Sequence, residues 1–307
     1  MRAITAGILA LALVASEASA QTSIKIGCSP TPDCVNAMIA IEEGIFKKNG
    51  IDAEMVVVAI NSNIPAALLS DSIQFGGPTP TVFLQSIDGG LDLAGVGSAA
   101  VMTKAASDSF ALMVKPDSNL RTAKDLAGKR VAVPGFNALL HVYLRHWLAL
   151  NGVDPKSVNF IEGSFPAMGD LLKAGTVDAI ISGQPFMGRV VEAKTGVIMA
   201  NFLADIPDGS SLILYAANRR WAEANPKIVA AFRASIAEGA KIANSDPEKV
   251  RAAAGRFLKM PPAVAATIVP GRYDPGLDAR QIGWWLDVMS KQSMLQTKID
   301  PEKTLLK

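Results

Sequence analysis

The side chains best suited to chemistry in this sequence are two cysteines and two histidines. Cys28 and Cys34 lie six positions apart, and His141 and His146 lie five apart in a segment with helical spacing. Five residues correspond to about 140° around a helix, so the two imidazoles face different sides and no metal site is expected. The cysteines could close a short loop through a disulfide, or Cys34 could pack in the first helix while Cys28 stays free, because spacing does not establish the geometry.

Small hydroxyl and amide side chains recur in short polar segments that suit the binding of a solute. No Ser-His-Asp pattern and no paired carboxylates occupy these segments, so no catalytic residue and no cofactor are expected, and the protein is not expected to be an enzyme. Each segment alone could be a simple turn. The predicted ligand-binding residues are Ser29, Thr31, Asn61, Ser62, Pro78, Thr79, Ser98, Gly135, Phe136, Asn137, Ala138, Leu139, Ser164, Phe165 and Gln184. Among them, Thr79, Asn137 and Gln184 are expected to contact the polar part of a ligand, with Phe136 and Phe165 as apolar walls.

The elements that must position these residues are strands and helices in alternation. Apolar residues at helical spacing predict helices, and short valine-rich or alternating runs predict strands. The predicted strands are 23–27, 51–59, 72–76, 91–96, 110–114, 130–133, 157–161, 177–181, 197–202 and 211–217, and the predicted helices are 35–48, 64–69, 79–87, 122–128, 139–151, 166–174, 186–194, 226–244, 246–258, 261–269 and 278–291. This order predicts an α/β fold with mixed, mostly parallel sheets flanked by helices.

The chain path predicts two lobes, one inserted into the other. Residues 21–107 and 208–307 are expected to form lobe 1, and residues 108–207 the inserted lobe 2. The two crossings, near 107–111 and 208–212, would then act as a hinge. Ligands of open α/β sheets bind beyond the carboxyl ends of the strands, where helix N-termini converge. The polar segments that carry the predicted ligand-binding residues follow predicted strands, so we expect them to line a cleft between the lobes.

The N-terminal sequence and the composition limit the classes to which this protein can belong. Residues 1–20 have a positive charge, an apolar run and the small-x-small sequence Ala18-Ser19-Ala20, which is the pattern of a cleaved export signal. No cysteine follows the cleavage point, so no lipid anchor is expected. Lys and Arg number 30 against 28 Asp and Glu, without a dense basic block, so no nucleic-acid partner is expected.

Four segments resemble one family of binding proteins. Residues 39–54 (IAIEEGIFKKNGIDAE), 75–80 (FGGPTP), 125–135 (DLAGKRVAVPG) and 175–181 (GTVDAII) occur in the family's order and spacing. Together they resemble the nitrate/sulfonate/taurine-type periplasmic solute-binding proteins, also called the thiamine-pyrimidine-synthase-like family. The resemblance covers the whole chain after residue 20.

This resemblance implies a fold and a function. The fold would be a two-lobed periplasmic binding protein of type II. The protein would be a monomeric, periplasmic component of an ABC importer that delivers a small solute to the membrane permease, and through the permease to the ATPase. An enzyme on the same fold is the alternative, although the pyrimidine-forming relatives rely on a cysteine cluster and histidine ligands. A sensory ligand-binding module is a further alternative, and we expect no additional domain or anchor that would favour it.

Two departures from the family pattern bear on the ligand. The segment 135–139 (GFNAL) replaces the usual run of small residues, and Gln184 replaces the usual acid before Pro185. These changes favour a bulkier, partly apolar solute over nitrate or a simple sulfonate. We expect an organic anion, a sulfonate or a carboxylate, with a pyrimidine as another candidate.

Overall fold

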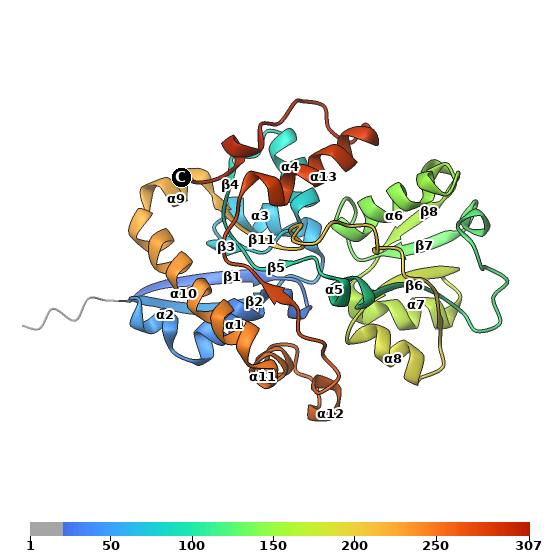
Figure 1. The fold of residues 1–307 in the computed structure, drawn as a ribbon, viewed down its shortest axis with the longest axis horizontal. Coiled ribbons are helices and arrows are strands. Elements are labelled where there is room, and N and C mark those ends of the chain that lie inside the picture. Colours follow the sequence, from blue (N-terminus) through green and yellow to red (C-terminus); the bar gives the residue numbers. More distant parts are fainter. Residues whose placement is uncertain (1–20) are drawn as a thin grey trace, which may run out of the picture.

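The structure is a computed structural model that describes residues 21–307. It contains two five-stranded β-sheets flanked by helices, and a small two-stranded sheet (Figure 1). The expected export signal, residues 1–20, lies outside the described residues. Within residues 21–307, no helix combines the length and the apolar character needed to span a bilayer.

The first sheet has five strands, and one of them runs against the others. Its order is β2 (Ile51–Val57), β1 (Thr22–Cys28), β3 (Phe75–Gly76), β11 (Leu214–Asn218) and β4 (Leu93–Ser98). Strand β1 is parallel to β2 and β3, whereas β11 is antiparallel to β3 and β4. We call this sheet, with the helices packed on it, the first lobe. Those helices are α1 (Val35–Glu42), α2 (Ile45–Lys48), α3 (Ile64–Leu69), α4 (Pro80–Asp88), α9 (Arg219–Ala224), α10 (Pro226–Ser245), α11 (Pro247–Phe257), α12 (Pro262–Ala265) and α13 (Ala279–Lys291).

The second sheet repeats this arrangement in the middle of the chain. Its order is β10 (Val197–Ala200), β6 (Phe110–Val114), β9 (Ala179–Gly183), β7 (Arg130–Val133) and β8 (Asn159–Glu162). Strands β7, β8 and β9 are parallel, and β6 is antiparallel to β9 and β10. Its helices are α6 (Leu139–Leu150), α7 (Met168–Ala174) and α8 (Phe186–Glu192). We call this unit the second lobe; it lies to the right in Figure 1. The predicted α/β class with mixed sheets is confirmed.

An aromatic cluster anchors the short strand β3 in the first lobe. The Phe75 ring stacks on the Phe232 ring of α10, with centroids 3.8 Å apart, and meets the Trp221 ring edge-on at 5.4 Å. Tyr215 on the neighbouring strand β11 packs on the same Phe232 at 5.1 Å. Aromatic pairs of this kind contribute about 0.5–1.5 kcal/mol each beyond the area they bury. The cluster therefore fixes the strand that leads into the polar segment at residues 77–79.

The two chain crossings between the lobes are hydrogen-bonded to each other. The Gly209 N–H donates to the Met102 carbonyl, and Ser211 bridges to Val101, at the end of β5 (Ala100–Val101). Strand β5 also pairs with β12 (Arg272–Tyr273), and α5 (Lys104–Asp108) follows it into the second lobe (Figure 1). The predicted lobe boundaries at residues 107/108 and 207/208 stay predictions, as does the hinge.

A separate contact joins the lobes through α6 and α13. Tyr143 of α6 packs against the rings of Trp284 and Trp285 of α13, with centroids 5.8 and 6.3 Å away. The Gln292 side chain, just after α13, donates a hydrogen bond of 3.1 Å to the Val142 carbonyl. The lobes therefore touch through packed aromatic surface as well as through the crossings.

Several elements differ from the sequence prediction for local reasons. The predicted helix 35–48 is split into α1 and α2 because Gly44 adopts a left-handed conformation, with φ of 69°. The predicted strand 91–96 is β4, Leu93–Ser98, so Ser98 belongs to the strand rather than to the loop after it. Helix α5 was not predicted, and the predicted helix 261–269 is only α12, Pro262–Ala265.

Candidate functional site

A cavity lies between the lobes at the carboxyl ends of strands from both sheets. Its empty space is about 470 Å³, part of it open to solvent. The lining residues are Ser29, Thr31, Asp33, Asn61, Thr79, Phe110, Pro134, Ala138, Leu139, Leu140, Phe165, Leu212 and Ile213. The polar members come from the first lobe, and the second lobe supplies apolar ones. The cavity therefore has one polar wall and one apolar wall.

Asn61 holds the polar wall together. Its amide nitrogen donates to the Ser29 hydroxyl and to the Gly77 carbonyl, both at 3.1 Å, and its amide oxygen accepts from the Thr79 N–H at 2.8 Å. These partners follow β1 and β3, and Asn61 follows β2, so a single buried side chain links three strand ends. Both amide protons and the oxygen of Asn61 are used within the protein.

Thr79 connects the polar wall to the second lobe. Its hydroxyl oxygen accepts from the Val82 N–H at 3.4 Å, which caps α4, and from the Leu139 N–H at 3.3 Å, at the start of α6. It also lies 3.1 Å from the Thr81 hydroxyl. Ser62 makes a second bond between the lobes by donating to Glu162 Oε1 at 3.2 Å. The lobes are therefore hydrogen-bonded across the cavity.

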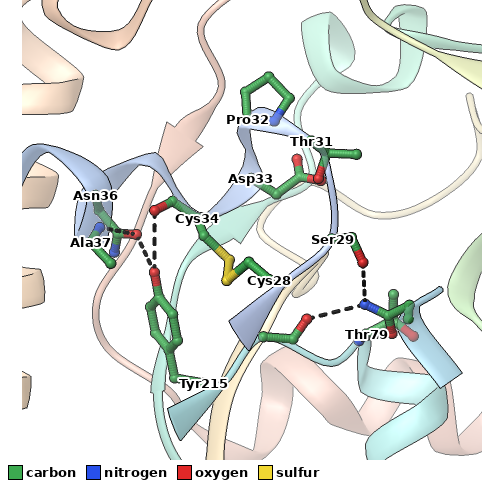
Figure 2. Close-up of a disulfide and its surroundings, with 12 residues drawn as sticks. Cys28, Ser29, Thr31, Pro32, Asp33, Cys34, Asn36, Ala37, Thr79 and Tyr215 are labelled. Carbon is green, nitrogen blue, oxygen red and sulfur yellow. Dashed lines mark hydrogen bonds between the residues drawn. A yellow bond between two sulfur atoms is a disulfide. The ribbon is translucent and has the colours of Figure 1, made fainter. Parts of the chain in front are cut away.

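A disulfide closes the loop that supplies most of the polar wall. Cys28 and Cys34 are bonded, which resolves the two alternatives left open by the sequence, and the loop between them carries Ser29, Thr31 and Asp33 (Figure 2). Gly77 lies against this bridge. A β-carbon at Gly77 would lie 2.8 and 2.9 Å from the two sulfur atoms, so the close approach requires glycine.

Replacing Gly77 by alanine is expected to lower the free energy of unfolding by about 1–3 kcal/mol, because the added methyl group overpacks the disulfide and Ile213. Chemical denaturation under oxidising conditions measures this loss. Gly283→Ala is the matched control: a β-carbon there meets nothing within 4 Å, and alanine favours the helix by up to about 1 kcal/mol. Equal stability of the two variants would contradict the packing argument.

Asp33 is the one ionisable side chain in the cavity lining. Its Oδ2 accepts a 2.7 Å hydrogen bond from the Thr31 hydroxyl. Asp33 is partly buried, and part of the residue is accessible from the cavity. Burial raises the pKa of Asp33, and the bond from Thr31 only partly opposes that change. The carboxylate is therefore held in an environment that does not fully stabilise its charge.

The apolar wall of the cavity is built around two phenylalanines of the second lobe. Phe110 begins β6 and Phe165 lies before α7, and their rings are 6.4 Å apart between centroids. Phe165 in turn stacks on Phe186 of α8 at 6.2 Å. Leu139 and Leu140, from the first turn of α6, complete the wall. This surface suits a flat or branched apolar group.

The loop before α6 turns its aromatic side chain away from the cavity. Glu162 Oε1 accepts from the Phe136 N–H at 2.6 Å, and Asn137 has a left-handed φ of 60°. The Phe136 side chain is 41% exposed and packs edge-on to the ring of His141. His141 Nδ1 accepts from the Asn137 N–H at 2.9 Å, so this nitrogen carries no proton. Burial, and next the charge of Arg145, lowers the pKa of His141 to about 3.

The structure brings only part of the predicted site to the cavity. The predicted residues that line it are Ser29, Thr31, Asn61, Thr79, Ala138, Leu139 and Phe165. Gln184 lines an adjoining cavity, where its amide oxygen accepts from the Gly188 N–H. Outside the cavity lining lie Ser62, Pro78, Ser98, Gly135, Phe136, Asn137 and Ser164. Ser98 is buried inside β4, and the predicted apolar wall at Phe136 is supplied instead by Phe110 and Phe165.

The sequence prediction also missed lining residues. These are Asp33, Phe110, Pro134, Leu140, Leu212 and Ile213. Asp33 had a usable signal, since it lies two residues after Thr31 in the same strand-end segment. The strand-end rule gives no signal for Phe110 and Leu212, because these residues belong to the two chain crossings. The crossings lie side by side and bring both residues to the cavity lining.

The sequence and the fold have relatives among known proteins. Residues 31–250 match the family described as NMT1/THI5 like. The chain is 24% identical over 288 residues, 85% of its length, to the nitrate import ATP-binding protein NrtC of Synechococcus elongatus, of which it covers 41%. It is 25% identical over 261 residues, 73% of its length, to the nitrate/nitrite binding protein NrtA of the same organism, of which it covers 55%. The chain thus spans about half the length of these curated relatives, or less.

Among solved structures, the chain is similar to the alkanesulfonate-binding protein SsuA of Xanthomonas axonopodis bound to MOPS. The TM-score is 0.76 with 20% identity, over 93% of this chain and 98% of that one. The similarity confirms the predicted fold, which is that of the periplasmic binding proteins.

Proposed function

The chain belongs to the NMT1/THI5-like family, and from this premise we propose that it is the extracytoplasmic solute-binding component of an ABC importer. Its partners would be the membrane permease and, through the permease, the ATPase. It would work in the periplasm, after removal of residues 1–20, as a monomer that catalyses no reaction. The NrtC and NrtA relatives, whose names refer to nitrate import and nitrate binding, support this class of function.

The cavity between the lobes is the observation that carries the proposal. Its walls come from both lobes, and the lobes are hydrogen-bonded to each other beside it, through Thr79 with Leu139 and Ser62 with Glu162. Parting of the lobes would open a site of this kind further, and contacts of a bound solute to both walls would then favour closure. Capture by closure is what a carrier protein requires.

The two walls describe the solute in outline. The cavity is small, and side chains of both lobes line it. Phe110 and Phe165 would contact an apolar part of the solute, and the loop 28–34 a polar part. We therefore propose a small organic solute rather than an inorganic ion. Of the predicted site, Ser29, Thr31, Asn61, Thr79, Ala138, Leu139 and Phe165 are the residues we retain for ligand contact or for shaping the cavity.

A matching solute is expected to stabilise the protein and to compact it. A panel of sulfonates, aromatic acids, pyrimidines and amines can be screened by thermal shift, where a solute at one hundred times its Kd adds about 2.7 kcal/mol of stability. Small-angle scattering with the best compound is expected to show a smaller radius of gyration.

Ala138→Phe places the test in the cavity, because its ring would occupy the solute's space, and this variant is expected to lose the response. Ala149→Phe is the control, since Ala149 is exposed on the same helix. A solute that stabilises Ala138→Phe as strongly as the unmodified protein would place the site elsewhere. Unchanged scattering at saturation would contradict closure.

A further inference from the structure

We propose that the solute presents an N–H donor, in the form of an amine or an amino group on a ring, to Asp33. This inference rests on the proposed function, because it assumes that the cavity between the lobes is the solute site. It differs from the anionic solute expected from the sequence. The reasons are the charges and the hydrogen-bonding groups of the cavity lining.

The charge of the lining has one sign. Asp33 is part of it, whereas no lysine, arginine or histidine of the described chain is among the lining residues. No basic group within residues 21–307 forms an ion pair with Asp33. A carboxylate or sulfonate in the cavity would thus face a like charge without a compensating cation, and burying such a group is costly. A cationic or neutral N–H donor of the solute would instead supply a hydrogen bond to the Asp33 carboxylate.

The supply of hydrogen bonds points the same way. In the polar wall, the amide protons of Asn61 are bound to Ser29 and Gly77, and the Thr31 hydroxyl donates to Asp33 Oδ2. Within residues 21–307, the hydrogen bond from Thr31 goes to Asp33 Oδ2, and no protein donor reaches Oδ1. The wall therefore offers a free carboxylate oxygen and few free side-chain donors. A ligand that brings its own donor fits this wall better than one that needs donors.

The groups that face Asp33 from neighbouring elements do not supply a positive charge. Tyr215 of β11 and Tyr273 of β12 both lie close enough for their pKa to be affected by Asp33. Burial raises the pKa of each phenol, and Asp33 raises it further, so both stay neutral. The start of α1 follows Asp33 and favours a negative charge, yet the pKa of Asp33 is still raised, so that contribution does not satisfy the carboxylate.

The opposite wall suits the remainder of such a solute. Phe110 and Leu212 border both this cavity and the adjoining one, and Asp33 lies at the same boundary. Asp33 therefore shares the cavity between the lobes with Phe165, Leu139 and Leu140 of the apolar wall. An apolar skeleton with an amino group at one end would satisfy both walls at once.

The test uses four probes with one skeleton: phenethylamine, 2-phenylethanol, 3-phenylpropanoate and 2-phenylethanesulfonate. Calorimetry at pH 7 is expected to show that the amine binds at least tenfold more tightly than either anion. In Asp33→Asn this preference is expected to disappear, with at least a tenfold loss for the amine and no loss for the anions. Asp52→Asn is the matched control, because Asp52 is an exposed carboxylate of β2 in the same lobe, and it should leave all affinities unchanged.

The fold of Asp33→Asn can be checked without a solute. Its thermal midpoint at pH 7 is expected to equal or exceed that of the unmodified protein, since a buried charge whose pKa is raised no longer has to be ionised. Amine binding in the unmodified protein is expected to weaken as the pH falls through the pKa of Asp33, and in Asp33→Asn that dependence should vanish.

The outcomes separate this inference from the proposed function. An anion that binds more tightly than the amine, and whose binding Ala138→Phe abolishes, would overturn the inference and leave the carrier function standing. Amine binding that is undetectable at millimolar concentration, or unaffected by Asp33→Asn, would also overturn it. Binding of every probe that is insensitive to Ala138→Phe would overturn both.

Discussion

Asn61→Ala is expected to lower the free energy of unfolding by about 3–5 kcal/mol and to abolish solute binding. The substitution leaves the Thr79 N–H, the Gly77 carbonyl and the Ser29 hydroxyl without their partner, and all three are buried. Each unpaired buried group costs about 1–3 kcal/mol. Urea denaturation of the unliganded variant measures the stability, and calorimetry with the best solute measures the affinity.

Two further variants make this expectation specific. Asn63→Ala removes an exposed amide from the same segment and is expected to change neither property, because no hydrogen bond of the Asn63 side chain is present in the described structure. Asn61→Asp keeps the acceptor for Thr79 but loses the two donated bonds, so it should fall between the unmodified protein and the alanine variant. A stable Asn61→Ala variant with full affinity would show that the three strand ends are held in place by something else.

Acidification from pH 7.5 to pH 5 is expected to destabilise the protein through His141. The folded protein holds its pKa near 3, mainly by burial, against 6.5 for an exposed histidine. The folded value is the lower one, so the stabilisation is complete above pH 6.5 and is lost as the pH falls towards 3. Protonation of the unfolded state alone removes about 2 kcal/mol by pH 5. Denaturation midpoints measured across this range give the slope.

His141→Asn separates this effect from other titrations. The asparagine oxygen can replace Nδ1 as the acceptor for the Asn137 N–H, and it does not titrate. Burial, and next Lys291, lowers the pKa of His146 as well, but this contribution is common to both proteins. The variant should therefore show a flatter stability profile between pH 7.5 and pH 5. Parallel profiles would mean that His141 is protonated in the folded state.

Hydrophobic periodicity was sufficient for most of the fold. Strands β6 and β7 and helix α3 have the predicted bounds, because each is a short apolar run closed by a polar or glycine-containing turn. Hydrophobic periodicity does not show where a residue adopts a left-handed conformation. The break between α1 and α2 at Gly44, inside the predicted helix 35–48, was therefore not predicted. Periodicity also does not report pairing between distant segments, so β5 and α5 at the crossings were missed.

The candidate site was predicted at the level of segments rather than side chains. The strand-end rule identified the segment 135–139, but it does not say which residues turn inwards. The left-handed Asn137 and the bond from the Phe136 N–H to Glu162 direct Phe136 outwards and leave Ala138 and Leu139 facing the cavity. Asp33 was not predicted, although it lies in the same strand-end segment as Thr31, and the structure shows that it lines the cavity.

The disulfide bears on the conditions under which the proposed cavity can bind a solute. The bridge from Cys28 to Cys34 encloses the three residues of the polar wall that precede α1, and Gly77 packs directly on its sulfur atoms. In a reducing compartment the two cysteines would not be bonded. The loop 28–34 would then lack its covalent constraint. In the exported carrier that we propose, oxidation of the two cysteines would therefore come before solute binding.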